Sequence, residues 1–335
     1  MRKLIVKVLL LAMTSIMTQN VGAYDFNKGG LYYSKINETE VEVVKNPYGK
    51  YTGVIYIPSS IDTQSGTFEV VKIAELAFSS STVTSITLPN SIKEIDRCAF
   101  LNSSSLGSVF WGNNIQKVEE DAFLNCNNLS SVHINDLAVW CNIVFEGTYS
   151  NPLMYAHHLF YDNNLITDLI IPEGVTEIKF NAFAGLNEIE SVTLPKSLKK
   201  INTSAFYWCI SLTQVNVESL TDWCSITFMD NPLKYAGNLC VNGEIITDLV
   251  IPEGVKKIGD NTFNGCSAVS CIIPAGVDSV GNSAFYNCSF LQEVTIPSDL
   301  SYIGNYAFSH CKSLQSINLP NSIKELGNGV FSSCI

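Results

Sequence analysis

The sequence predicts a solenoid, in which short coils stack on one another around a single elongated core. Phenylalanine recurs at intervals that are mostly 22–23 residues, apolar residues keep fixed offsets from it, and a short alternating segment ending in proline separates the units. A unit of this length cannot bury its own apolar side, so a core forms only when successive units stack. The repeating residues are Phe78, Phe100, Phe123, Phe183, Phe206, Phe263, Phe285, Phe308 and Phe331.

The fixed offsets describe the inside of each coil. An aliphatic residue stands five and eight positions before each phenylalanine, and stacking should place equivalent side chains on one another. Alternating segments such as 191–195 (SVTLP) predict short strands, with proline at the end where no hydrogen-bond donor is needed. Ten parallel strands spaced about 4.8 Å apart would form one sheet roughly 48 Å long on one face. Loops and short helical turns are expected on the other face.

Two longer coils interrupt the repeat in a matching way, at about residues 134–171 and 217–251. Both contain Trp-Cys, Asn-Pro-Leu and Ile-Thr-Asp-Leu segments, with Trp140 matching Trp223 and Asp168 matching Asp248. A larger unit was therefore duplicated. A tryptophan that recurs at one position of a duplicated coil favours core packing over a ligand-stacking platform.

The chain divides into three segments. Residues 1–23 are expected to be a signal peptide, because Arg2, Lys3 and Lys7 precede a short apolar stretch and small residues end at Ala23. Residues 24–68 lack the repeat and are expected to form an N-terminal β cap over the first coil. Residues 69–335 form the solenoid with its nine phenylalanine units. The chain stops at Ile335, before the next strand of the repeat, which favours a sequence that continues beyond this point.

The repeat resembles the BspA-like leucine-rich repeats of exported bacterial surface proteins. The unit is clearest over residues 273–296, and the two longer coils and the opening residues 24–33 are also similar to units of that family. The resemblance implies a right-handed leucine-rich-repeat solenoid, export to the cell surface or secretion, and adhesion or recognition. It also implies host extracellular-matrix or cell-surface proteins as partners.

Composition restricts the class of partner. The formal net charge is −11, and the expected signal peptide carries three basic residues and no acidic ones, so the exported chain is more acidic still. An acidic surface repels phosphate backbones, which excludes nucleic acid as an expected partner. No stretch after residue 23 is long and apolar enough for a transmembrane helix.

Eleven cysteines in an exported protein first suggest disulfides. Six of them, however, stand three residues after a repeat phenylalanine, where Leu186 and Ser103 occur in other units. Stacked side chains at one such position point the same way rather than toward each other. We therefore expect buried free thiols that behave as small apolar residues. No cysteine pair has metal-ligand spacing with histidine, so no metal or other cofactor is expected.

Catalysis has weak support in the sequence. Cys141 and His157 could be drawn as a nucleophile and base, but Cys224 stands at the equivalent place without a histidine. His157 and His158 could hold a metal, yet the second long coil has Gly237 and Asn238 there, which favours a solvated surface. No phosphate-binding loop or nucleophile elbow occurs. We expect a protein that is not an enzyme.

The outer face of the predicted sheet is the candidate binding surface. In each strand the middle residue points away from the core, and solenoids use such rows as broad binding surfaces. We therefore expect recognition or adhesion through this row; the alternative is a structural spacer or scaffold on the cell envelope with no ligand of its own. The candidate partner-binding residues are His133, Thr193, Asn216, Thr295 and Asn318.

Overall fold

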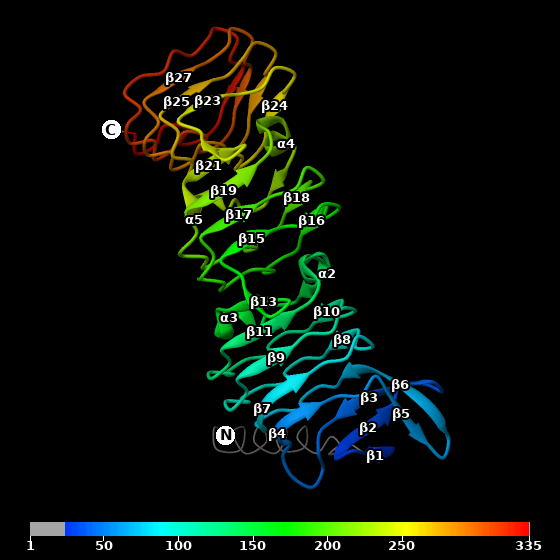
Figure 1. Ribbon diagram of the computed structural model, residues 1–335. Helices are drawn as coiled ribbons and strands as arrows, with labels where there is room; N and C mark the ends of the chain where they lie inside the picture. The colour runs from blue at the N-terminus through cyan, green and yellow to red at the C-terminus, as the bar shows by residue number, and fades with distance from the viewer. Residues whose placement is uncertain (1–23, 335) are drawn as a thin grey trace, which may run out of the picture.

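The structure, a computed structural model, describes residues 24–334 and is a parallel β-solenoid of about 11 turns. The coils stack from a β-rich N-terminal end to the C-terminus at the opposite end (Figure 1). The predicted fold class is confirmed. The expected signal peptide, residues 1–23, lies outside the described residues.

The N-terminal end is built from antiparallel pairs. β1 (Phe26–Lys28) pairs with β2 (Leu31–Lys35), and β2 pairs with β3 (Glu40–Val44). β3 then pairs in parallel with β6 (Gly66–Ile73), which also forms a hairpin with β5 (Ser60–Thr63). Tyr33 and Val43, both fully buried, join the core of the first coil, so this segment covers the end of the solenoid.

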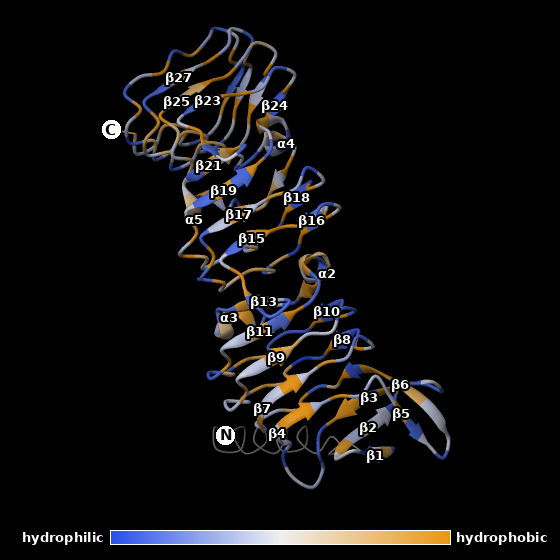
Figure 2. Ribbon diagram, viewed as in Figure 1, coloured by the Kyte–Doolittle hydropathy of each residue, from blue (hydrophilic) through white to orange (hydrophobic). Residues whose placement is uncertain are grey.

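One face of the solenoid carries the longer strands, which we call the wide sheet. β14 (Asn164–Leu165) and β22 (Glu244–Ile245) turn back antiparallel, and the hydrogen-bonded ladder stops after each, so the single sheet expected from the sequence is instead three. β4 (Thr52–Tyr56) and β7 (Thr82–Thr87) are coloured mainly as hydrophobic in Figure 2. The first ladder contains β4 (Thr52–Tyr56), β7 (Thr82–Thr87), β9 (Ser108–Phe110), β11 (Ser131–Ile134), β13 (Leu159–Tyr161) and β14 (Asn164–Leu165). The second ladder contains β15 (Asp168–Ile170), β17 (Ser191–Thr193), β19 (Gln214–Val217), β21 (Asn238–Val241) and β22 (Glu244–Ile245). The third ladder contains β23 (Asp248–Val250), β25 (Ser270–Ile272) and β27 (Glu293–Thr295).

A second set of parallel ladders, which we call the narrow sheet, was not predicted. Except for β6, its strands are two residues long, and each contains the residue five positions before a repeat phenylalanine or its counterpart in a long coil. This residue is buried in every strand but β29, where Leu326 is exposed. Alternation over two residues is too short to be recognised in a sequence. Its further members are β8 (Glu94–Ile95), β10 (Lys117–Val118), β12 (Val144–Phe145), β16 (Glu177–Ile178), β18 (Lys200–Ile201), β20 (Thr227–Phe228), β24 (Lys257–Ile258), β26 (Ser279–Val280), β28 (Tyr302–Ile303) and β29 (Glu325–Leu326).

The repeat phenylalanines form stacked ladders through the core, as predicted. Phe78, Phe100 and Phe123 stack with ring centroids 5.2 and 4.9 Å apart and planes within 9° of parallel. Offset stacking at this separation adds attraction between rings to the burial of apolar area. Ladders of the same kind join Phe183 to Phe206 and run from Phe263 through Phe285 and Phe308 to Phe331.

The phenylalanine ladder is interrupted at the two long coils, each of which buries a tryptophan instead. Trp140 lies in α2 (Leu137–Asn142) and Trp223 in α4 (Leu220–Cys224), and both are buried, which confirms their predicted place in the core. Each indole Nε1–H donates to a backbone carbonyl of the following coil, Ala182 at 2.7 Å and Thr262 at 2.9 Å. A buried carbonyl that lacks a hydrogen-bond donor costs free energy of folding. The two indole donors avoid this cost where a long coil packs against an ordinary one.

A short helix follows in each long coil, α3 (Leu153–Ala156) and α5 (Leu233–Ala236). The next coil meets each helix at a glycine in a left-handed conformation, Gly185 with φ +84° and Gly265 with φ +82°. A Cβ at Gly185 would lie 2.7 Å from the Leu153 carbonyl oxygen, and one at Gly265 would lie 2.6 Å from Cα of Lys234. Only glycine allows this approach without a backbone shift.

The cysteine position of the repeat is a buried hydrogen-bond donor. The Sγ of Cys209 lies 3.3 Å from the carbonyl oxygen of Phe183 in the preceding coil, and Cys126, Cys288, Cys311 and Cys334 make the same contact at 3.1–3.2 Å. Ser103 substitutes with its hydroxyl, 2.6 Å from the Phe78 carbonyl oxygen. Leu186 takes this position in the coil directly after a long coil, where the preceding coil has no repeat phenylalanine to supply the carbonyl.

Candidate functional site

The outer face of the wide sheet is organised by strand register. In most strands of the wide sheet the residue before the outward position is buried, as Val132 is beside His133, because side chains alternate between the two faces. Register then aligns the outward residues of neighbouring strands into one row in each ladder, and we call the three rows together the outer row. It consists of Tyr56, Thr87, Phe110, His133 and Phe160 with Leu165 in the first ladder, Ile170, Thr193, Asn216 and Cys240 with Ile245 in the second, and Val250, Ile272 and Thr295 in the third.

His133 is enclosed between two aromatic rings of this row. Its imidazole stacks on Phe110 with centroids 4.4 Å apart and on Phe160 with centroids 4.7 Å apart. The His133 Nε2 lies 3.1 Å from the Ser131 hydroxyl. Desolvation by the flanking rings lowers the pKa of His133 below its ordinary value. The middle of the first ladder is therefore a flat aromatic surface with no positive charge at neutral pH.

The other sequence-predicted residues occupy different environments. Thr193 and Asn216 are register neighbours in β17 and β19, and the Asn216 amide lies 3.4 Å from the Thr193 hydroxyl. Thr295 follows Ile272 in the third ladder. Asn318 is exposed but lies in no strand, because the ladder ends at β27. The structure thus brings four of the five candidates onto one face, in three groups, and leaves Asn318 outside the sheet.

Several residues of the outer row were not found from the sequence. Ile170, Ile245 and Val250 are 62, 51 and 51% exposed, although aliphatic residues are normally assigned to the core. They lie in β15, β22 and β23, each of which is the first or last strand of its ladder. Each of these strands therefore has a hydrogen-bonded neighbour on one side only. The duplication of the Ile-Thr-Asp-Leu segment was visible in the sequence and could have located them. The two aromatic neighbours of His133 required the strand register.

Most of the cysteines are buried, which limits their reactivity as thiolates. All eleven are free in the structure, and the predicted burial of the ladder thiols holds for Cys126, Cys209, Cys266, Cys288 and Cys311, while Cys334 is half-buried. Desolvation raises the pKa of Cys141 to about 12, so its thiolate is scarce at neutral pH. The thiol considered as a nucleophile is therefore unsuited to that role.

The neighbouring histidines bind backbone rather than one another. The His157 Nδ1 lies 2.8 Å from the Gly185 carbonyl oxygen, and the His158 Nδ1 lies 3.0 Å from the Ala156 carbonyl oxygen. The His158 Nε2 lies 3.8 Å from the Glu188 carboxylate. The His158 Nδ1 also lies 3.1 Å from the Ser130 carbonyl oxygen, so the two histidines join the end of α3 to the coils on either side of it.

Comparison with known proteins identifies the repeat. A family model described as "BspA type Leucine rich repeat region" matches the chain in six copies, over residues 58–151, 155–236 and 234–335. The chain belongs to this BspA-type leucine-rich repeat family. The resemblance seen in the sequence is confirmed. No curated protein matches the sequence of the chain.

Solved structures similar to this BspA-type chain are bacterial repeat proteins. A leucine-rich cell surface protein from Faecalibacterium prausnitzii is 20% identical, with a TM-score of 0.52, and the match covers 95% of this chain and 88% of that one. A leucine-rich repeat protein from Bacteroides ovatus is 24% identical with a TM-score of 0.49, covering 93% of each chain. The pneumococcal vaccine antigen PcpA is 18% identical with a TM-score of 0.49, covering 94% of this chain and 80% of that one. The first of these likenesses supports the fold.

The narrow sheet of this BspA-type solenoid carries an acidic cluster. Carboxylate oxygens of Glu94, Asp96 and Glu119 lie within 4.8 Å of one another. The ammonium group of Lys72 is 2.8 Å from Asp96, and that of Lys117 is 2.8 Å from Glu119. Both lysines also lie 3.5 Å from Glu94, so the cluster is an ion-pair network that joins successive coils.

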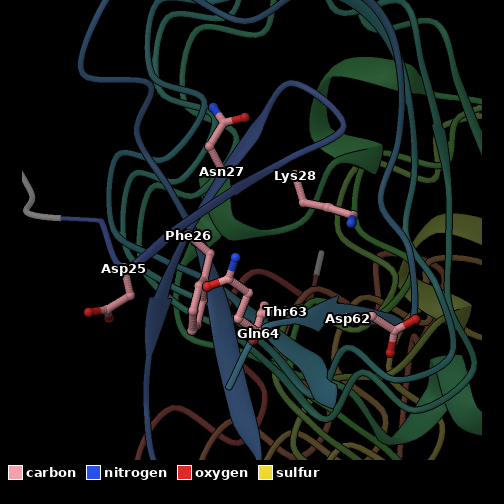
Figure 3. A pocket seen from close by; sticks show the side chains of 7 residues that line it. All are labelled: Asp25, Phe26, Asn27, Lys28, Asp62, Thr63 and Gln64. Carbon is pink, nitrogen blue, oxygen red and sulfur yellow. The ribbon is translucent and has the colours of Figure 1, made fainter. Parts of the chain in front are cut away.

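A shallow hollow lies at the N-terminal cap, between β1 and the hairpin of β5 and β6. Its lining residues are mostly polar, and Asp25 and Asp62 lie at opposite ends of it (Figure 3). The Asp25 carboxylate accepts a hydrogen bond from the Lys35 backbone N–H, and the Asp62 carboxylate accepts one from the Thr67 hydroxyl. Because these groups serve the hairpins and do not converge, the hollow offers no catalytic arrangement. Among residues 24–334, no helix is long and apolar enough to cross a bilayer.

Proposed function

We propose that the protein is exported to the cell surface or secreted and binds other proteins through the outer face of the wide sheet. The observation that carries the proposal is the row of exposed apolar side chains on that face. Tyr56 is 72% exposed and Ile170 62%, and they lie on the same row as the Phe110–His133–Phe160 stack. Exposed apolar rows are typical of protein interaction surfaces.

The shape of the solenoid supports a broad contact. Each coil of the wide sheet contributes at least one outward residue to the row, so a single partner can touch several coils at once. Aromatic side chains such as those beside His133 are enriched at the centres of protein interfaces because they bury much area with little loss of side-chain entropy. A host matrix or cell-surface protein is the partner that the family resemblance suggests, and export rests on the expected signal peptide.

The test is capture of purified host matrix proteins by folded residues 24–335, measured by surface plasmon resonance. A variant with Thr193→Arg and Asn216→Arg places two long cations on the outer row. The matched control, Val144→Arg with Thr227→Arg, adds the same charge to exposed positions of the narrow sheet. We expect saturable binding that the first variant abolishes and the control retains. Equal binding by all three proteins would refute this face as the binding surface and favour a spacer.

A further inference from the structure

The two long coils place a matching pair of side chains on the outer face of the wide sheet. In the first, Asp168 and Ile170 point outward from β15, and in the second, Asp248 and Val250 point outward from β23. All four side chains are exposed. Each aspartate accepts a 2.6 Å hydrogen bond from a serine of the next strand, Ser191 or Ser270. We call these the acid–aliphatic pairs.

Charge is segregated between the two faces of the solenoid. The described strands of the wide sheet contain no lysine and no arginine, whereas four acidic residues lie on them: Asp168, Glu244, Asp248 and Glu293. The lysines are concentrated on the narrow sheet, where Lys72, Lys117 and Lys200 form ion pairs with glutamates or aspartates. The outer face of the second and third ladders is therefore acidic and aliphatic without compensating cations.

The two pairs lie on the same row at a defined separation. Four hydrogen-bonded steps lead from β15 to β22 and one further step, across the break, leads to β23; at about 4.8 Å for each step this is about 24 Å. Between them the row carries the small residues Thr193 and Asn216 and the buried Cys240. A helix of about 16 residues covers the same distance. One partner segment lying along the solenoid axis can thus reach both pairs.

We propose that the partner of this face is a basic, apolar protein segment that contacts both acid–aliphatic pairs. This inference rests on the proposed function and specifies the class of partner. Aliphatic contact at Ile170 and Val250 would exclude water from the adjacent carboxylates, and a carboxylate attracts lysine or arginine more strongly when water is displaced. The same acidic face disfavours phosphate polymers and anionic bilayers.

The probe is an 18-residue amphipathic helical peptide of leucine and lysine, compared with a peptide in which glutamate replaces every lysine. Binding to residues 24–335 is measured by fluorescence anisotropy at low and high salt. We expect the lysine peptide to bind, with affinity falling as salt rises, and the glutamate peptide not to bind. Asp168→Asn with Asp248→Asn should weaken binding about tenfold, as should Ile170→Ser with Val250→Ser.

The control variant separates this site from general attraction to an acidic protein. Glu173→Gln with Glu253→Gln removes the same two charges from the same duplicated coils, but at exposed positions beyond the strands. We expect it to bind the lysine peptide as the unmodified chain does. Equal losses for the Asp168/Asp248 and Glu173/Glu253 variants would overturn the proposal. So would a single Asp168→Asn change that weakens binding as much as the double change.

The same variants distinguish this inference from the proposed function. If matrix-protein capture is abolished by Thr193→Arg with Asn216→Arg but not weakened by Asp168→Asn with Asp248→Asn, the face binds protein and the basic-partner inference is wrong. If neither change affects capture, the proposed function fails as well. Thermal unfolding of each variant, monitored by circular dichroism, confirms that a loss of binding is not a loss of fold.

Discussion

The indole Nε1–H of Trp223 donates a hydrogen bond to the backbone carbonyl of Thr262, 39 residues later in the chain, at 2.9 Å. The side-chain amide of Asn231 donates to the same oxygen at 2.8 Å. Trp140 and Asn151 repeat this arrangement on Ala182 in the first long coil. A long coil is thus joined to the next ordinary coil by two side-chain donors that converge on one carbonyl.

Trp223→Phe keeps an aromatic ring but removes the indole donor. We expect the free energy of unfolding to fall by about 1–3 kcal/mol, because a buried bond is lost and a smaller ring leaves space in the core. Urea unfolding followed by circular dichroism measures the change. Trp208→Phe, at a half-exposed indole on the surface, is the control and should change the free energy by less than about 0.5 kcal/mol.

The thiol donor can be tested by comparing two buried cysteines. Cys209→Ala removes the contact to the Phe183 carbonyl oxygen, whereas Cys266 follows a long coil and makes no corresponding contact to a repeat phenylalanine. We expect Cys209→Ala to cost about 1 kcal/mol more than Cys266→Ala, and Cys209→Ser to recover part of it, as Ser103 does naturally. Equal costs in urea unfolding would contradict the donor role.

A ladder of glycine and asparagine joins the last coils. The Asn305 side chain accepts from the Asn328 backbone N–H at 2.7 Å, and a Cβ at Gly304 would lie 2.6 Å from the Asn282 nitrogen. We expect Gly304→Ala to destabilise the protein by about 1–3 kcal/mol, because the coils must separate. Gly49→Ala, where a Cβ meets nothing within 4 Å, is the matched control and should be nearly neutral in thermal unfolding.

Glu177 should make stability depend on pH in the acid range. Hydrogen bonds from Asn202, Lys179 and Lys200 lower the pKa of Glu177 to about 2. A carboxyl whose pKa is lowered on folding stabilises the protein above its unfolded pKa, and this contribution disappears as pH falls through the folded pKa. Glu177→Gln should therefore cost up to about 1 kcal/mol at pH 7, since Glu177 is partly exposed, and much less at pH 2, where most of this contribution is lost. A difference that persists at pH 2 would contradict this assignment.

Much of the core could be predicted because it depends on a local repeat. The spacing of Phe78, Phe100 and Phe123 predicts stacking of identical positions, and the structure places their rings 4.9–5.2 Å apart. The same reasoning placed Trp140 and Trp223 inside. It could not predict that β13 turns back as β14, because a two-residue reversal leaves no periodic pattern.

The sequence by itself determined the solenoid, the buried ladders and the outward direction of residues such as His133 and Thr193, because side-chain alternation along a strand is a local property. Only the tertiary structure decided which outward residues meet. The stack of Phe110 on His133, and the placement of Asp168 and Asp248 on one cation-free face, depend on register between strands more than 20 residues apart. Register arises from the packing of whole coils, and so it cannot be read from any one of them.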